Sequence, residues 1–181
     1  MITAVDEFEE CLDLARQLLS GSDETTDLWE ASDLCNRALR LRPKDAVAWL
    51  VKAQVLLHLD DEAAALAAAE MALRRLPRNP EAHYLHASAL SQMGRFDDAL
   101  RSITRAFQFS NLTDADPSLV EELYFEKAAI LEAMNRSEEA ELTLEAGLRQ
   151  FPESELLKAG LAPLRRERLR KSLRVLPGGL K

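Results

Sequence analysis

Apolar and small residues recur along the chain at the spacing of one face of a helix. Two such stripes lie between residues 46 and 79, and they consist of Trp49, Ala53 and Leu56 followed by Ala65, Ala69 and Ala72. Each set stands at i, i+4 and i+7, which places its members on one side of an α-helix. The charged pair Asp60–Asp61 separates the stripes, and Pro77 closes the segment because proline cannot continue a helix. The pattern predicts a helical hairpin whose small residues let its two helices approach closely.

The hairpin pattern repeats along the chain at an interval of 34 residues. This interval separates Ala31, Ala65 and Ala99, and also Ala38, Ala72 and Ala106, Pro43 and Pro77, Trp49 and His83, and Ala53 and Ala87. A repeat of this length that carries no strand signal is typical of stacked helical hairpins. We therefore predict an all-α solenoid of about four hairpins, at about residues 3–43, 46–79, 80–111 and 121–154.

Two of these hairpins depart from the regular frame. The first is expected to have its leading helix at about Val5–Leu19, followed by a linker, Ser20–Asp27, that is longer than a tight turn. The fourth is displaced, because 41 residues separate Ala106 from Gly147 where 34 would be regular. The seven extra residues fall in the polar stretch Ser110–Asp116, which predicts an enlarged loop.

The residues after the fourth hairpin predict one further helix, at about 155–176. Leucines form an approximate apolar stripe along it, at Leu157, Leu161, Leu164, Leu169, Leu173 and Leu176. Pro163 is expected to kink this helix or to start a new one. We predict that the helix caps the last hairpin, that residues 1–176 form a single domain, and that residues 177–181 are a flexible tail.

These residues give the chain its resemblance to a known family. The chain resembles the tetratricopeptide repeat (TPR) proteins, whose pattern has an aromatic residue, a small residue four positions on, further alanines and a closing proline. The unit at 46–79 follows this pattern closely, whereas the next unit has His83 in place of the aromatic residue and Asn111 in place of the proline. The resemblance covers nearly all of residues 5–154. It implies a non-catalytic protein-binding role as an adaptor, scaffold or chaperone.

Composition and charge limit the other classes of function. The chain has no apolar run long enough to span a bilayer, so we expect no integral membrane segment. Its N-terminus is acidic and does not fit a secretory signal, so we expect a cytoplasmic location. Cys11 and Cys35 both fall on predicted core faces, where a free cysteine behaves as a small apolar residue. The formal net charge is −8, yet residues 164–174 carry six Arg or Lys and one Glu.

In relatives of this family the ligand usually lies along the inner face, which the first helices of successive hairpins line. The resemblance places the following residues on that face: Val47, Leu50, Val51, Gln54, His58, Glu81, Tyr84, Leu85, Ser88, Glu122, Phe125, Glu126 and Ala129. Leu50, Tyr84 and Phe125 occupy equivalent positions, so we expect a row of apolar anchors. In the alternative, packing between hairpins or the C-terminal helix covers these residues.

The chemistry of this face indicates what kind of ligand it would take. Chaperone-binding TPR domains grip a peptide carboxylate with Lys, Asn and Arg, but the positions here hold no basic cluster, as Leu50, Gln54 and Glu122 illustrate. We therefore expect a protein or peptide with apolar anchors and some basic residues. A loose similarity in size, acidity and repeat number to the small TPR chaperones of bacterial secretion systems adds the alternative of shielding an apolar segment of a client.

The basic C-terminal helix offers a second candidate surface, formed by Arg165, Arg166, Arg168, Arg170 and Lys171. A cap on the last hairpin is the favoured interpretation, and docking to an acidic partner, an anionic membrane or nucleic acid is the alternative. No aromatic residues interleave with the arginines, so we expect no nucleic-acid partner. A further alternative is a homo-oligomer in which this helix enters the acidic groove of a neighbouring copy.

Catalytic chemistry has little support in the sequence. His83 and His86 stand at i, i+3 on one predicted helix, but His83 occupies a core position, where a packed histidine is favoured over a metal ligand. The sequence contains no Gly-rich phosphate loop, nucleophile elbow or HExxH motif. We predict no catalytic residues, no metal site and no cofactor, so the chain is not expected to be an enzyme.

Overall fold

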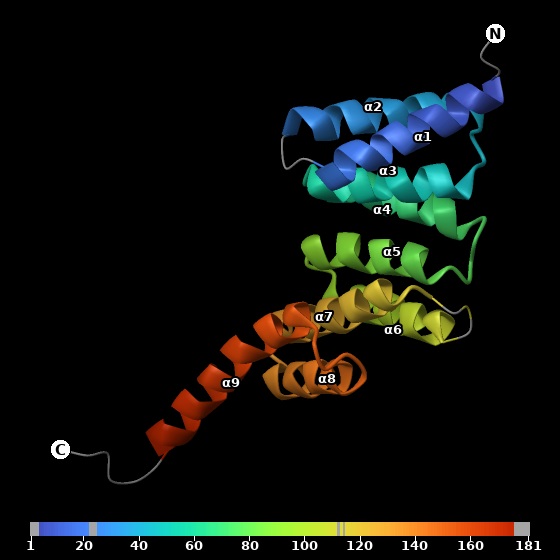
Figure 1. The fold of residues 1–181 in the computed structure, drawn as a ribbon. Coiled ribbons are helices and arrows are strands. Elements are labelled where there is room, and N and C mark those ends of the chain that lie inside the picture. Colours follow the sequence, from blue (N-terminus) through green and yellow to red (C-terminus); the bar gives the residue numbers. More distant parts are fainter. Residues whose placement is uncertain (1–3, 22–24, 112, 114, 176–181) are drawn as a thin grey trace. The chain divides into compact units, whose positions relative to one another are not determined.

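The computed structural model describes residues 4–21, 25–111, 113 and 115–175 of the 181-residue chain. The described residues form helices and turns, with no strand among them (Figure 1). The helices are α1 (Ala4–Gly21), α2 (Thr25–Leu41), α3 (Ala46–His58), α4 (Glu62–Leu73), α5 (Pro80–Gln92), α6 (Phe96–Ser110), α7 (Pro117–Ala133), α8 (Ser137–Gln150) and α9 (Glu155–Val175). They form four hairpins followed by one further helix, as the 34-residue pattern predicts.

The contacts divide the chain into two compact units. Unit 1 is Met1–Thr113 and contains α1 to α6, whereas unit 2 is Asp114–Lys181 and contains α7 to α9. In unit 1 each hairpin pairs its own two helices, and α4 also packs on α5. In unit 2, α9 packs against both α7 and α8. A single domain over residues 1–176 stays a prediction.

Local sequence signals explain where the helices begin and turn. Asp45 and Asn79, one repeat apart, accept hydrogen bonds from Ala48 N at 2.9 Å and from Ala82 N at 2.7 Å, so each caps the start of a helix. Between the two helices of the second, third and fourth hairpins, one residue adopts a left-handed backbone. These residues are Asp60 (φ 54°), Gly94 (φ 73°) and Asn135 (φ 60°). Glycine and asparagine tolerate this conformation best, and it lets the chain reverse within a tight turn.

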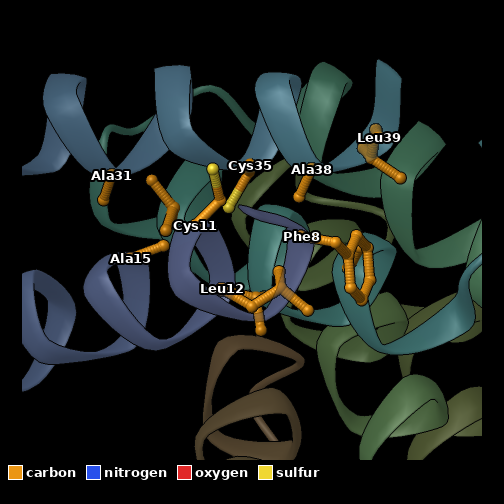
Figure 2. Packing of buried hydrophobic residues seen from close by; sticks show 11 residues of the cluster. Phe8, Cys11, Leu12, Ala15, Ala31, Cys35, Ala38 and Leu39 are labelled. Atoms are coloured by element: carbon orange, nitrogen blue, oxygen red, sulfur yellow. The ribbon is translucent and has the colours of Figure 1, made fainter. Parts of the chain in front are cut away.

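Small residues at the repeat positions form the seams between helices. The alanines 34 residues apart, Ala31, Ala65 and Ala99, are completely buried. In the first hairpin the side chains of α1 and α2 point toward one another around these positions (Figure 2). Cys11 and Cys35 lie together in this core, and burial raises the pKa of the Cys35 thiol to about 12. Both cysteines therefore occupy core faces, as predicted.

Three details differ from the sequence expectations. Helix α1 continues to Gly21 and α2 begins at Thr25, so the described helices leave a shorter linker than Ser20–Asp27. Helix α7 begins at Pro117, four residues before the expected hairpin start, because Asp116 caps it and proline is favoured in a first turn. Helix α9 runs through Pro163 as one helix, so no new helix starts there, and a kink at Pro163 stays a prediction. The predicted tail 177–181 lies outside the described residues.

Candidate functional site

Packing between helices buries several positions that were expected on the binding face of unit 1. Leu50 and Leu85 are 4% and 2% exposed and belong to one apolar core between α3, α4 and α5, and Val51 belongs to the core of the first hairpin. The expectation that Leu50 is an exposed anchor is therefore wrong. A helix with neighbours on two sides buries a wider part of its circumference than the same helix would in an isolated hairpin. Leu50 falls within that wider buried part.

The other unit 1 positions are accessible to different degrees. Val47 and His58 are exposed, and the half-buried positions are Gln54, Glu81, Tyr84 and Ser88. Burial raises the pKa of Glu81, an effect that the nearby Arg16 opposes. Tyr84 packs at the margin of the core that holds Leu85, so part of its ring is available to a ligand.

Unit 2 contains an apolar pocket beside α7, which we call the α7–α9 pocket. It has a volume of about 360 Å³ and is lined by Phe125, Ala128, Ala129, Glu132, Leu144, Leu156, Ala159, Gly160, Pro163 and Leu164. Two of the predicted site residues, Phe125 and Ala129, lie in its wall, one turn apart on α7. The lining residues come from all three helices of unit 2, α7, α8 and α9. Helix α9 packs on both α7 and α8.

The shape of this pocket depends on a glycine of α9. A Cβ atom at Gly160 would lie 3.1 Å from Cε2 of Phe125 and 3.4 Å from Cδ1 of Leu144. Glycine therefore lets the α9 backbone approach the Phe125 ring while leaving open space next to it. The sequence pattern places Phe125 and Ala129 here, but it does not predict the residues that α9 adds, because only the packed position of α9 brings them to the same cavity.

One carboxylate lines the pocket. Glu132 is the only charged residue in the lining, it is exposed, and it forms no ion pair with any residue that the structure describes. The carboxylates of α7 that the sequence places on the binding face are Glu122, which is exposed, and Glu126, which is half-buried. An apolar pocket with a carboxylate at its edge favours a ligand with an apolar side chain and a positive charge next to it.

The first half of α9 caps the last hairpin, as predicted, but its second half does not. Leu157, Leu161 and Leu164 are buried against the hairpin, whereas Leu169 and Leu173 are 58% and 67% exposed. The step from Leu164 to Leu169 is five residues, which turns the side chain by about 140° and carries it off the core face. The predicted stripe therefore ends at Leu164 among the described residues, and Leu176 lies outside them.

The basic residues of α9 divide between two faces. Arg165 donates a hydrogen bond of 2.8 Å to Glu145 on α8, and Nη1 of Arg168 lies 3.0 Å from Oε1 of the buried Glu141. The hydrogen bond from Arg165 lowers the pKa of Glu145. These two arginines thus hold the cap on the hairpin. Lys171 lies 3.9 Å from Glu167 of its own helix.

Arg166 and Arg170 lie on another side of α9. Arg166 donates a long hydrogen bond of 3.4 Å to the carbonyl oxygen of Ala162 in its own helix. Neither arginine forms an ion pair with a residue in the described part of the chain. We call Arg166, Leu169, Arg170 and Leu173 the open face of α9.

Unit 1 also has a polar cavity of about 190 Å³, lined by Leu66, Glu70, His86, Leu90, Arg95, Asp98, Arg101, Ser102 and Arg105. Nδ1 of His86 lies 2.8 Å from the hydroxyl of the buried Ser102, and burial lowers the pKa of His86. Asp98 binds both Arg95 and Arg101, so one carboxylate is shared by two guanidinium groups. The neighbouring His83 is buried, as its core position predicts.

The chain belongs to the tetratricopeptide repeat family, whose pattern matches residues 30–80 and 84–155, more than half of the sequence. Proteins of this family are in general non-catalytic interaction modules, and an all-α solenoid of helical hairpins describes the fold. Among curated proteins no sequence matches significantly.

Solved structures show the same fold at low sequence identity. TTC0263, a thermophilic TPR protein of Thermus thermophilus, is 20% identical with a TM-score of 0.73, and the match covers 92% of this chain and 87% of that one. MamA is 13% identical with a TM-score of 0.68, covering 93% and 86%. YrrB, a TPR protein with an unusual peptide-binding site, is 18% identical with a TM-score of 0.61, covering 86% and 84%. At these levels of sequence identity, the similarity shows a shared fold and nothing about function.

Two further observations concern the described part of the chain only. No helix there combines the length and the apolarity needed to cross a membrane. Its histidines, cysteines and carboxylates form no cluster of three that could hold a metal ion.

Proposed function

We propose that this protein is an interaction module, acting as an adaptor, scaffold or chaperone, that binds a peptide segment of another protein. The α7–α9 pocket carries this proposal, because it is an apolar cavity beside Phe125, which the TPR resemblance places on the ligand-binding face. Its volume of about 360 Å³ falls within the usual range of ligand pockets, roughly 300–1,000 Å³. An apolar side chain of the ligand that enters it would lose its contact with water, which favours binding.

The proposed ligand has an apolar anchor and a basic residue close to it. The anchor enters the α7–α9 pocket, and the basic residue meets Glu132 at the rim. In unit 1, Tyr84 is proposed as a separate ligand contact, and Val47 and Gln54 are accessible on α3 of the same unit. Leu50 takes no part, since it is buried. Buried, free cysteines are compatible with the cytoplasm as the proposed location.

A selection from a random peptide display library on the purified protein tests this function. We expect enrichment of peptides that combine a large apolar residue with Lys or Arg. Ala129→Phe should fill part of the pocket and weaken binding of these peptides by at least about tenfold, since an apolar side chain would be excluded. Ala133→Phe is the matched control, because Ala133 is also exposed on α7 but does not line the pocket.

Two results would contradict the proposal. One is a selection that enriches no peptide in replicate experiments. The other is a set of bound peptides whose affinity is unchanged both by Ala129→Phe and by Tyr84→Ala, in variants whose circular dichroism shows an intact fold.

A further inference from the structure

The open face of α9 is an apolar and basic surface with nothing covering it in the described structure. Leu169 and Leu173 stand one turn apart and are 58% and 67% exposed. Arg166 and Arg170 flank them and lack an ion pair with any described residue. A pair of exposed leucines on a charged protein is typical of an interaction surface, because burial on a partner removes them from water.

The α7–α9 pocket has the complementary properties. Its wall is apolar, Glu132 supplies a negative charge at the rim, and Phe125 and Ala129 stand one turn apart on α7. Leu169 and Leu173 have the same one-turn spacing on α9. Two helices that lie against each other can therefore place both leucines over the pocket and bring an arginine to Glu132.

The open face of α9 cannot reach the pocket of its own molecule. Gly160, which lines the pocket, and Leu169 are nine residues apart on a continuous helix. Nine residues span about 13.5 Å along the axis of a helix, and a continuous helix cannot fold back to bring Leu169 over the pocket beside Gly160. A second molecule must supply any α9 open face that enters the pocket.

We propose that the α7–α9 pocket binds the open face of α9 from a second copy of this chain, so that the protein self-associates. Leu169 and Leu173 of one copy fill the pocket of the other, and Arg166 or Arg170 meets Glu132. This inference rests on the proposed function, since it names the partner of the same pocket. Donor and acceptor both belong to unit 2, so each copy offers one of each.

Sedimentation velocity of the full chain over a range of protein concentrations tests the self-association. We expect the mass to rise above that of a monomer with increasing concentration. Leu169→Glu with Leu173→Glu should remove the donor, and Ala129→Phe should block the acceptor, each weakening association by at least about tenfold because apolar burial is lost. Ala133→Phe is the control that should associate as the unmodified chain does, since its position lies outside the pocket.

A mixing experiment makes the test independent of misfolding. The donor variant retains an intact pocket, and the Ala129→Phe variant retains an intact open face. Each should be monomeric alone, whereas an equimolar mixture should form a complex of one copy of each. A mixture that stays monomeric, although circular dichroism shows both variants folded, would overturn the proposal.

Failure of this inference can be told apart from failure of the proposed function. A chain that is monomeric at every concentration, but whose library-selected peptides are lost on Ala129→Phe, overturns the self-association and leaves peptide binding intact. Association that persists equally in the donor variant and in Ala129→Phe also overturns the pairing of these two surfaces. Dispersal by both variants supports it, whatever the peptide selection yields.

Discussion

His83 Nε2 lies 3.0 Å from the carbonyl oxygen of Pro77, and this pair repeats the bond that Trp49 makes to Pro43 one repeat earlier, also at 3.0 Å. A carbonyl oxygen can only accept, so Nε2 of His83 carries the hydrogen. The histidine also stacks on Phe109, with 5.2 Å between ring centroids. A neutral histidine thus replaces the aromatic residue of the repeat and keeps its hydrogen bond.

Acid should therefore destabilise the protein. Burial holds the pKa of His83 below its ordinary value of 6.5, and it does the same for His86. The unfolded chain then binds protons at a higher pH than the folded chain, so the free energy of unfolding falls as the pH drops through 6.5. Urea unfolding at a series of pH values should show this decline. His83→Phe should make the decline shallower, and an unchanged pH dependence in that variant would refute the assignment to His83.

Gly147 occupies the position that alanine holds in the other repeats, and the structure explains the exchange. A Cβ atom there would lie 2.8 Å from Cδ1 of Leu157 and 2.9 Å from Cγ of Tyr124, which is too close. We expect Gly147→Ala to lower the free energy of unfolding by about 1–3 kcal/mol through overpacking, against the usual gain of alanine in a helix. Gly160→Ala, with a nearest contact of 3.1 Å, is the milder comparison in the same denaturation experiment. Equal or higher stability of Gly147→Ala would contradict the packing.

Asp60 adopts a left-handed backbone at the turn where the next repeat has Gly94. A residue with a Cβ atom is disfavoured in this conformation by roughly 1 kcal/mol, and aspartate only partly escapes that cost. Asp60→Gly should therefore raise the free energy of unfolding by up to about 1 kcal/mol, and the reciprocal Gly94→Asp should lower it. Chemical denaturation of the two variants measures both effects. A loss of stability in Asp60→Gly would contradict the inference that the left-handed backbone at Asp60 is strained.

The two cysteines should be unreactive while the protein is folded. Cys11 and Cys35 are both buried, and the raised pKa of Cys35, about 12, keeps its thiol protonated. A thiol reagent such as Ellman's reagent should label neither cysteine in the native protein at pH 8 and both in denaturant. Fast labelling of the native protein would show that the first hairpin opens readily.

The spacing of the sequence is sufficient to predict the hairpins, because helix periodicity and turn chemistry are local properties. The alanine seams and the polar break before α7 lie where the pattern places them. The exposure of Leu50 could not be predicted in this way. It depends on how many neighbouring helices surround α3, which is a property of the packed units.

The sequence by itself determined the repeat, the helices and the family, since each depends on residues close together in the chain. Only the tertiary structure decided how α9 is used. Packing on α8 directs Arg165 and Arg168 to carboxylates, forms a pocket from Phe125 and Gly160, and leaves Leu169 exposed. The physical reason is that burial and ion pairing depend on which side of a helix meets its neighbour, and residues distant in the chain fix that side.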